Sequence, residues 1–363
     1  MSVKRYTVDV AALAHNVQLL RKKAKGTTLW GVIKGNGYGM GIVQMAQVLA
    51  QNGISRFAVT DIREVRALRE AGVENPILMM EGTCNAQEVR QLLELGAILT
   101  VGTVEDAAVI NEQARLHSVK AQAHLKIDTG MGRYGFLPAQ METVRRLYSA
   151  NPYIQFTGIY THFYDSADPK PTKVQFEKFM EVVKQLRDAG IDTGMVHCCN
   201  SSAFLKYPQM HCDAARVGSA LLGRVTVGDK TGLKKIGQCE AEIEEIRTIP
   251  AGHTVGYGAG WVAKRRTRIA VLSIGYFHGF AVDRGFDLWR PKDCIRGIGR
   301  YLKALIRGKA LYVRVNGKQC PVLGHVGMVN MVIDITDCEC KTGDMAQVDI
   351  NPLLLKGVDV VYD

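Results

Sequence analysis

LWGVIKGNGYGMG, residues 29–41, is an apolar run that gives way to a glycine-rich turn, with Lys34 at the junction. Apolar runs of this strand-like type recur along the chain, at residues 56–61, 76–82, 97–102, 121–128, 154–163, 194–200 and 215–223. Amphipathic stretches lie between them, and two of these, residues 62–72 and 176–190, end on a glycine as a helix C-terminus does. Eight strands that alternate with helices predict an N-terminal (β/α)8 TIM-type barrel over residues 11–235.

The pattern of predicted secondary structure changes after residue 235. Segments such as RIAVLSIGY (268–276), ALYVRV (310–315) and NMVIDIT (330–336) are short, β-rich and separated by turn residues, and no convincing long helix is evident there. This pattern predicts a second, mainly antiparallel β domain over residues 236–363, and hence an α/β + β protein. Residues 1–10 include the strand-like YTVDV, and we expect them to join the β domain.

Composition narrows the class of protein. The 46 Lys and Arg exceed the 35 Asp and Glu, but they are scattered, so a nucleic-acid partner is not expected and small anionic ligands are favoured. No segment has the roughly 20 apolar residues of a membrane span, and the N-terminus lacks the apolar core of a secretory signal. The nine cysteines form no repeated CxxC pattern. We therefore expect a cytoplasmic protein with no membrane partner, no disulfide framework and no metal.

Polar residues gather at the predicted C-terminal ends of the barrel strands, where the active sites of such barrels lie. Lys34 could be a solvated loop residue, a phosphate ligand or an amine held ready to form a Schiff base with a carbonyl compound. Asn200-Ser201-Ser202 could be an ordinary helix cap or, with the segment 216–219, a phosphate cradle after strands seven and eight. A Schiff-base lysine opposite a phosphate cradle describes a pyridoxal 5'-phosphate site. The residues placed at this mouth are Lys34, Tyr38, Lys126, Arg133, His162, His197, Asn200, Ser201, Arg216, Gly218 and Ser219.

Several motifs, in order, resemble the alanine racemase family of fold type III pyridoxal-phosphate enzymes. They cover almost the whole chain: VIKGNGYGMG (32–41), HLKIDTGMGRYGF (124–136), THF (161–163), HCCNSS (197–202), RVGSALLG (216–223), VGYGAGW (255–261) and IAVLSIGYFHGF (269–280). The resemblance implies an isomerase that interconverts L- and D-amino acids with pyridoxal 5'-phosphate.

The resemblance assigns the two catalytic bases to different subunits. Lys34 would hold the cofactor and act as the base on one face of the substrate α-carbon. Tyr257 would be the opposite base, reaching from the β domain into the pocket of the partner subunit, so a homodimer with shared sites is implied. Arg216 would face the pyridine nitrogen. Since arginine keeps its proton, it would leave that nitrogen unprotonated and favour racemisation over transamination.

The resemblance also assigns the remaining site residues. Arg133 would contact the cofactor's phenolic oxygen and the substrate carboxylate, and Lys126 would be a carbamylated lysine that orients it, or else an ordinary lysine paired with Asp128. His162 would lie behind Tyr257 of the partner subunit and His197 near the cofactor ring, although each could equally be a satisfied core histidine. Cofactor contacts are implied for Tyr38, Asn200, Ser201, Gly218 and Ser219, and substrate contacts for Tyr276 and Met328.

The sequence departs from the family pattern around the substrate channel. His278 and Val329 replace two acidic residues, Leu222 replaces a bulky aromatic one, and the C-terminus lacks the usual Tyr-Arg ending, with Lys356 or a nearby leucine aligned in its place. These changes predict a less negative and wider pocket that accepts serine or a larger amino acid as well as alanine. The alternatives are a broad-specificity or serine-type racemase, a non-catalytic cofactor-binding sensor and a pyridoxal-phosphate decarboxylase.

Overall fold

A computed structural model describes residues 3–225, 231–283, 289–307 and 310–363. The chain divides into two compact units. The first comprises Asp9–Ile236, and the second joins Met1–Val8 to Gly237–Asp363.

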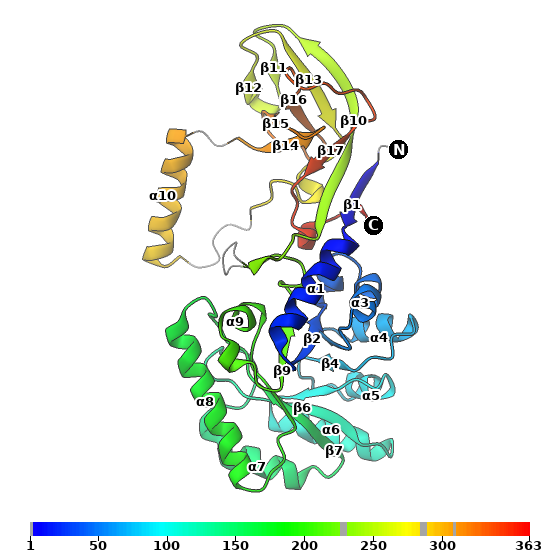
Figure 1. Cartoon of the computed structure of the whole chain (residues 1–363), viewed down its shortest axis with the longest axis vertical. Helices are drawn as coiled ribbons and strands as arrows, with labels where there is room; N and C mark the ends of the chain where they lie inside the picture. Colours follow the sequence, from blue (N-terminus) through cyan, green and yellow to red (C-terminus); the bar gives the residue numbers. More distant parts are fainter. Residues whose placement is uncertain (1–2, 226–230, 284–288, 308–309) are drawn as a thin grey trace. The chain divides into compact units, whose positions relative to one another are not determined.

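Parallel strands with helices between them build the unit Asp9–Ile236, which contains β2 to β9 (Figure 1). The strands pair in the order β4-β3-β2-β9-β8-β7-β6-β5, and a parallel bridge between Leu78 and Ile98 joins the two edge strands and nearly closes the sheet into a barrel. The predicted fold is confirmed. The strands are β2 (Thr28–Val32), β3 (Arg56–Val59), β4 (Ile77–Met79), β5 (Leu99–Val101), β6 (Ala121–Lys126), β7 (Ile154–Tyr160), β8 (Met195–His197) and β9 (Ala214–Val217).

Most helices of the barrel begin at a residue whose side chain accepts a hydrogen bond from the first turn. Asp61, Asn85 and Asp168 accept backbone N–H groups at the starts of α4, α5 and α8, and Thr103 forms a capping box at α6. The helices are α1 (Val10–Ala24), α3 (Ile42–Gln51), α4 (Ile62–Glu70), α5 (Ala86–Glu94), α6 (Val104–Leu116), α7 (Met141–Ala150), α8 (Pro169–Asp188) and α9 (Ser201–Lys206). Short 3-10 turns lie at Pro138–Gln140 and Pro208–Met210.

The β unit is organised by one long strand, β10 (Gly237–Ile249). Its first half pairs with β17 and β1, and its second half pairs with β13 after a register shift between Ile243 and Glu245. The order β13-β16-β15-β14-β17-β10 is closed by the β10–β13 pairing, and β18 pairs with β1 in parallel. The other strands are β1 (Lys4–Val8), β11 (Thr254–Val255), β12 (Trp261–Val262), β13 (Thr267–Leu272), β14 (Tyr312–Val315), β15 (Lys318–Leu323), β16 (Met331–Asp334), β17 (Met345–Val348) and β18 (Asp359–Tyr362).

The expectation that the β unit holds no long helix is wrong. A helix of 17 residues, α10 (Pro291–Arg307), follows β13 and precedes β14. It contains Gly297 and Gly299, each of which costs a helix interior roughly 1 kcal/mol relative to alanine and obscures the helical pattern. Short 3-10 turns also occur at Tyr257–Ala259, Tyr276–His278 and Pro352–Leu354.

Candidate active site

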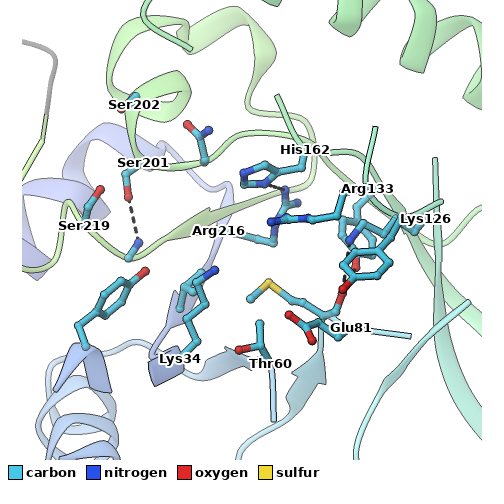
Figure 2. A pocket seen from close by; sticks show the side chains of 17 residues that line it. Lys34, Thr60, Glu81, Lys126, Arg133, His162, Ser201, Ser202, Arg216 and Ser219 are labelled. Atoms are coloured by element: carbon cyan, nitrogen blue, oxygen red, sulfur yellow. Dashed lines mark hydrogen bonds between the residues drawn. The ribbon is translucent and has the colours of Figure 1, made fainter. Parts of the chain in front are cut away.

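A cavity of about 240 Å³ opens at the carboxyl ends of the barrel strands, and every residue that lines it belongs to the barrel unit (Figure 2). Four cations face it, namely Lys34, Lys126, Arg133 and Arg216. Glu81 is the acidic residue among the described lining residues, so the cavity carries excess positive charge. Its other lining residues are Val32, Tyr38, Thr60, Met80, Tyr134, Tyr160, His162, Asn200, Ser201, Ser202, Gly218 and Ser219.

Lys34 begins a left-handed turn, labelled α2 (Lys34–Tyr38), that leads from β2 to α3. Gly35, Asn36 and Gly37 have φ values of 65°, 54° and 63°, and φ of Tyr38 is 57°. Residues with a Cβ rarely adopt these angles, except asparagine, which explains the sequence KGNG at this point. The Asn36 side chain accepts a hydrogen bond from the Ile42 N–H at 3.0 Å, which fixes the end of the turn against α3. The backbone conformation therefore sets the position of Lys34 at the cavity.

Arg216, on β9, is the most deeply buried of the four cations, with 3% of its surface exposed. One terminal nitrogen donates to Nδ1 of His197 at 2.8 Å, and the other donates to the Thr161 carbonyl at 2.7 Å. The described residues provide no carboxylate for an ion pair with Arg216 and no acceptor for its Nε–H. Burial lowers the pKa of the guanidinium, but an arginine remains protonated in any protein. The cavity therefore contains a fixed cation with an N–H left for a ligand.

The histidines around Arg216 are neutral, and their tautomers follow from its hydrogen bonds. Arginine can only donate, so Nδ1 of His197 is an acceptor and its Nε2 carries the proton. That Nε2 lies 2.9 Å from Nδ1 of His124, which must then accept as well. Arg216 also approaches Nδ1 of His162 at 3.4 Å, which leaves the proton on Nε2 of His162. Burial, followed by the charge of Arg216, lowers the pKa of both His124 and His162 to about 3 and that of His197 well below its usual value.

Lys126 and Arg133 are held at the opposite side of the cavity by β6 and the loop after it. The Asp128 carboxylate accepts the N–H groups of Gly130, Met131 and Arg133 at 2.8, 2.7 and 3.1 Å, and so shapes the loop that carries Arg133. Asp128 makes no ion pair with Lys126 among the described residues. The Lys126 ammonium instead contacts the Met80 carbonyl at 3.4 Å and the Tyr134 ring at 4.9 Å. Burial, then the charges of Arg133 and Arg216, lower the pKa of Lys126 to about 8.

The predicted phosphate cradle is ordered by Ser201. Its Oγ accepts the N–H groups of Gly218 and Ala220 at 2.9 and 3.2 Å, so its own hydroxyl proton remains available to a ligand. Because the Gly218 N–H is engaged in this way, we assign Gly218 a steric role: a Cβ at this position would lie 2.1 Å from the Tyr38 hydroxyl. Asn200 caps α9 through a hydrogen bond from the Ala203 N–H at 3.0 Å and accepts the Ser166 hydroxyl at 3.0 Å.

The cavity brings together most of the predicted site residues, with one exception in the barrel. His197 does not line it; the ring lies fully buried behind Arg216 and stacks on Tyr160, with ring centres 4.9 Å apart. The predicted cofactor contacts Lys34, Tyr38, Arg133, His162, Asn200, Ser201, Arg216, Gly218 and Ser219 all line it, as does Lys126.

The other predicted residues, Tyr257, Tyr276 and Met328, belong to loops of the β unit, and hydrogen bonds connect the loops of Tyr276 and Met328. The N–H groups of Tyr276 and Phe277 donate to the carbonyls of Gly327 and Met328, at 3.1 and 3.0 Å. Tyr257 is 81% exposed, and Tyr276 and Met328 are also exposed. These aromatic and apolar side chains are therefore available to a partner.

His278, which stands where the family pattern has an acidic residue, makes a structural contact of its own. Its imidazole is buried in the β unit, where Nδ1 accepts the Gly275 N–H at 3.1 Å and closes the turn that carries Tyr276. A carboxylate could accept the same hydrogen bond, so the histidine can replace aspartate as a turn cap. Leu222 is likewise buried and lies outside the described cavity lining, whereas Val329 is exposed.

Sequence reasoning missed several lining residues, including Thr60, Met80, Glu81 and Tyr160. Thr60 directly follows β3 and Glu81 lies two residues past the end of β4, at the strand ends that line the mouth of such a barrel. The same rule that selected Lys34 could therefore have found them. The Tyr160 hydroxyl donates to the Met80 carbonyl at 3.0 Å, and its ring carries the Arg216 guanidinium at 4.9 Å.

Comparisons with known proteins identify relatives across both units. Residues 8–225 match the family model of the alanine racemase N-terminal domain, and residues 236–351 match that of the C-terminal domain. The chain is 31% identical to the alanine racemase of Nostoc sp. over 335 residues, which are 90% of this chain and 81% of that protein. It is 29% identical to the alanine racemase of Methanococcus maripaludis over 351 residues, or 94% and 87% of the two chains.

Solved structures of similar proteins agree with these matches. An alanine racemase from D-cycloserine-producing Streptomyces lavendulae aligns with a TM-score of 0.86 and 25% identity, over 100% of this chain and 97% of that one. The biosynthetic alanine racemase of Pseudomonas aeruginosa aligns with a TM-score of 0.80 and 25% identity over the full length of both chains.

Proposed function

Since the chain belongs to the alanine racemase family, we propose that it interconverts L- and D-alanine and also accepts serine or a larger amino acid. The family consists of isomerases that depend on pyridoxal 5'-phosphate, so the chain is an amino-acid isomerase that uses this cofactor. The observation that carries the proposal is that one cavity contains both Lys34 and Arg216, and that no carboxylate of the described residues pairs with Arg216.

The donor set of the cavity fits this cofactor. Lys34 supplies the amine that would hold it, and the Ser201 hydroxyl and Tyr38 phenol offer donors to its phosphate. The free Nε–H of Arg216 offers a donor to its ring nitrogen. Excess positive charge suits a dianionic phosphate together with a substrate carboxylate. When bound, pyridoxal phosphate withdraws electrons from the amino acid and makes its α-proton acidic.

Lys34 and Tyr257 of the partner subunit would move that proton. In one direction Lys34 takes the proton from one face of the α-carbon and the tyrosine returns one to the other face; in the reverse direction the roles exchange. The bond broken and the bond formed are both C–H, so no oxidant or reductant is required. Arg216 donates a hydrogen bond without releasing its proton, which limits electron withdrawal and favours return of the proton to the α-carbon.

Lys126 would orient Arg133 once its amine has combined with carbon dioxide to form a carbamate. A pKa of about 8 leaves a substantial neutral fraction of the amine, which is the form that reacts. The product would carry a negative charge close to Arg133 and Arg216, whose charges already act on Lys126. Arg133, held by the Asp128 loop, would then position the substrate carboxylate.

A shared site requires a homodimer, which we place in the cytoplasm, and subunit mixing tests the shared site directly. We expect Lys34→Ala and Tyr257→Phe homodimers to be nearly inactive. When equal amounts are mixed and exchanged, half of the dimers are hybrids, and each hybrid has one intact site, so about a quarter of the wild-type activity should return. If one chain owned both bases, mixing would restore nothing.

The reaction itself is tested by exchange of the α-proton for deuterium, followed with chiral analysis of the product. The substrates to be assayed are alanine, serine and longer amino acids. Exchange accompanied by both enantiomers supports the proposal, and activity on alanine alone contradicts the wider substrate range. Cofactor binding without exchange would indicate a sensor, and loss of carbon dioxide would indicate a decarboxylase.

A further inference from the structure

Helix α10 (orange in Figure 1) has an apolar face that the described structure leaves exposed. Leu305 and Ile306 are each 81% exposed, and Ile295 is 70% exposed. The barrel helices show the usual outcome for such positions: Val65 and Leu68 on α4 are fully buried. The apolar residues of α10 are Ile295, Ile298, Tyr301, Leu302, Leu305 and Ile306.

The polar and apolar residues of α10 are cleanly separated around the helix axis. At about 100° per residue, the apolar side chains fill a sector of roughly 140°. The basic side chains occupy an adjacent sector of roughly 80°. These cations are Lys292, Arg296, Arg300 and Lys303, and the only acidic residue in the sequence of the helix is Asp293. Asp293 is already engaged, because it pairs with Arg290 at 2.6 Å and with Arg296 at 3.5 Å.

We propose that α10 docks the enzyme on an anionic membrane surface, with its apolar face in the lipid interface and its cations at the phosphate headgroups. A helix with a broad apolar sector and a Lys- and Arg-rich polar sector is the pattern of helices that lie in the plane of a membrane. Its 17 residues span about 25 Å, and none of the described helices is long and apolar enough to cross a membrane.

Aromatic residues and charge favour lipid over a second copy of the helix. Trp289, two residues before the start of α10, is 77% exposed, and Tyr301 lies at the border of the apolar sector. Such amphipathic rings are enriched at membrane interfaces. Pairing two α10 helices would bring together two stripes of cations with no free acidic side chain from either helix to neutralise them, whereas anionic headgroups are complementary along the whole length.

Vesicle flotation of the full-length holoenzyme tests this docking. The probes are vesicles of phosphatidylcholine alone and vesicles containing about a third phosphatidylglycerol; we expect flotation with the second at low salt and its loss at high salt. Each cation near an anionic surface changes partitioning about fivefold, so Arg296→Gln/Arg300→Gln should weaken binding by more than tenfold. Leu302→Ser/Leu305→Ser should weaken it by a similar or larger factor.

The control variant is Lys264→Gln/Arg266→Gln, which removes the same charge from an exposed loop of the β unit and should bind vesicles like the wild type. All three variants should keep the cofactor absorbance of the wild type, which shows that each remains folded. Emission from Trp289 should shift to the blue on binding, against the background of the buried Trp30 and the half-buried Trp261.

Equal binding to neutral and anionic vesicles, or no effect of the α10 variants, would overturn the proposal. The proposal would also be overturned if the control variant lost vesicle binding as the α10 variants do, because binding would then depend on the total charge of the protein and not on α10. A change of oligomeric mass in the α10 variants without vesicle binding would assign the face to a second copy. Capture by an acidic protein in place of vesicles would assign it to a protein partner. The readout is position in the gradient, so it is independent of whether the racemase proposal holds.

Discussion

Replacing Gly218 with alanine would place a methyl group against Tyr38, the tyrosine expected to reach the cofactor phosphate. The new Cβ would lie 2.1 Å from the Tyr38 hydroxyl oxygen, 3.0 Å from its Cζ and 3.2 Å from Cβ of Val32. Van der Waals contact begins near 3.4 Å, so Tyr38 must move. Gly218 is buried between β9 and the Lys34 turn, which leaves little room for that movement.

The size of the effect follows from the kind of contact. Overpacking of a buried site costs about 1–3 kcal/mol, and each kcal/mol lowers the Tm of a domain of this size by about 2–4 °C. A displaced Tyr38 also loses its hydrogen bond to a charged phosphate, worth about 1.5–3 kcal/mol, or roughly a ten- to hundredfold increase in the Kd of the cofactor.

Thermal unfolding and cofactor titration separate the two effects. In the double variant Gly218→Ala/Tyr38→Phe, loss of the hydroxyl removes the shortest contact, so most of the Tm should return while cofactor affinity stays low. Gly299→Ala is the matched control, because its Cβ would meet nothing within 4 Å. Wild-type Tm and cofactor affinity in Gly218→Ala, or a double variant no more stable than the single one, would refute the steric role of Gly218.

Three other outcomes are expected. The pKa values of His162 and His197 in the folded chain lie below the unfolded value near 6.5, so the unfolded chain binds more protons in acid. The free energy of unfolding should therefore fall as the pH drops below about 6.5, by up to ~1.4 kcal/mol per pH unit for each histidine. Urea unfolding of His162→Gln should show a shallower fall. Bicarbonate should raise kcat/KM near pH 8 in the wild type but not in Lys126→Arg, whose cation cannot form a carbamate. Intact mass under mild conditions should show the adduct. A variant that responds to bicarbonate like the wild type would contradict carbamate formation at Lys126. Tyr257→Phe should slow α-proton removal from one enantiomer far more than from the other, as deuterium exchange can show, and equal mild losses in both directions would contradict the two-base assignment.

The barrel could be predicted from the sequence because its signal is local. Each of the eight apolar runs overlaps a strand in the structure, and glycines such as Gly72 and Gly190 follow the helices between them. The helix α10 escaped this reasoning, because two glycines weaken its helix propensity while its apolar spacing is helical. For α10, the periodicity of the apolar residues indicates the helix better than the helix propensity of the individual residues does.

The site was predictable where a residue lies at or just past the carboxyl end of a strand. Lys34 and Arg216 were found in this way, and Thr60 and Glu81 could have been. The hydrogen bonds that give these residues their chemistry could not be found, because their partners are distant in sequence. His124 contacts His197 across 73 residues, and Ser201 accepts the Gly218 N–H across 17.

The sequence by itself determined the fold, the family and the cofactor, since strand and helix periods and the ordered motifs are properties of neighbouring residues. The tertiary structure decided the protonation of the site: the tautomers of His162 and His197 follow from a buried Arg216 that can only donate. It also decided that Gly218 serves as space for Tyr38 and that the apolar face of α10 is exposed. Burial and through-space contact are set by where distant segments meet, and no local pattern records that.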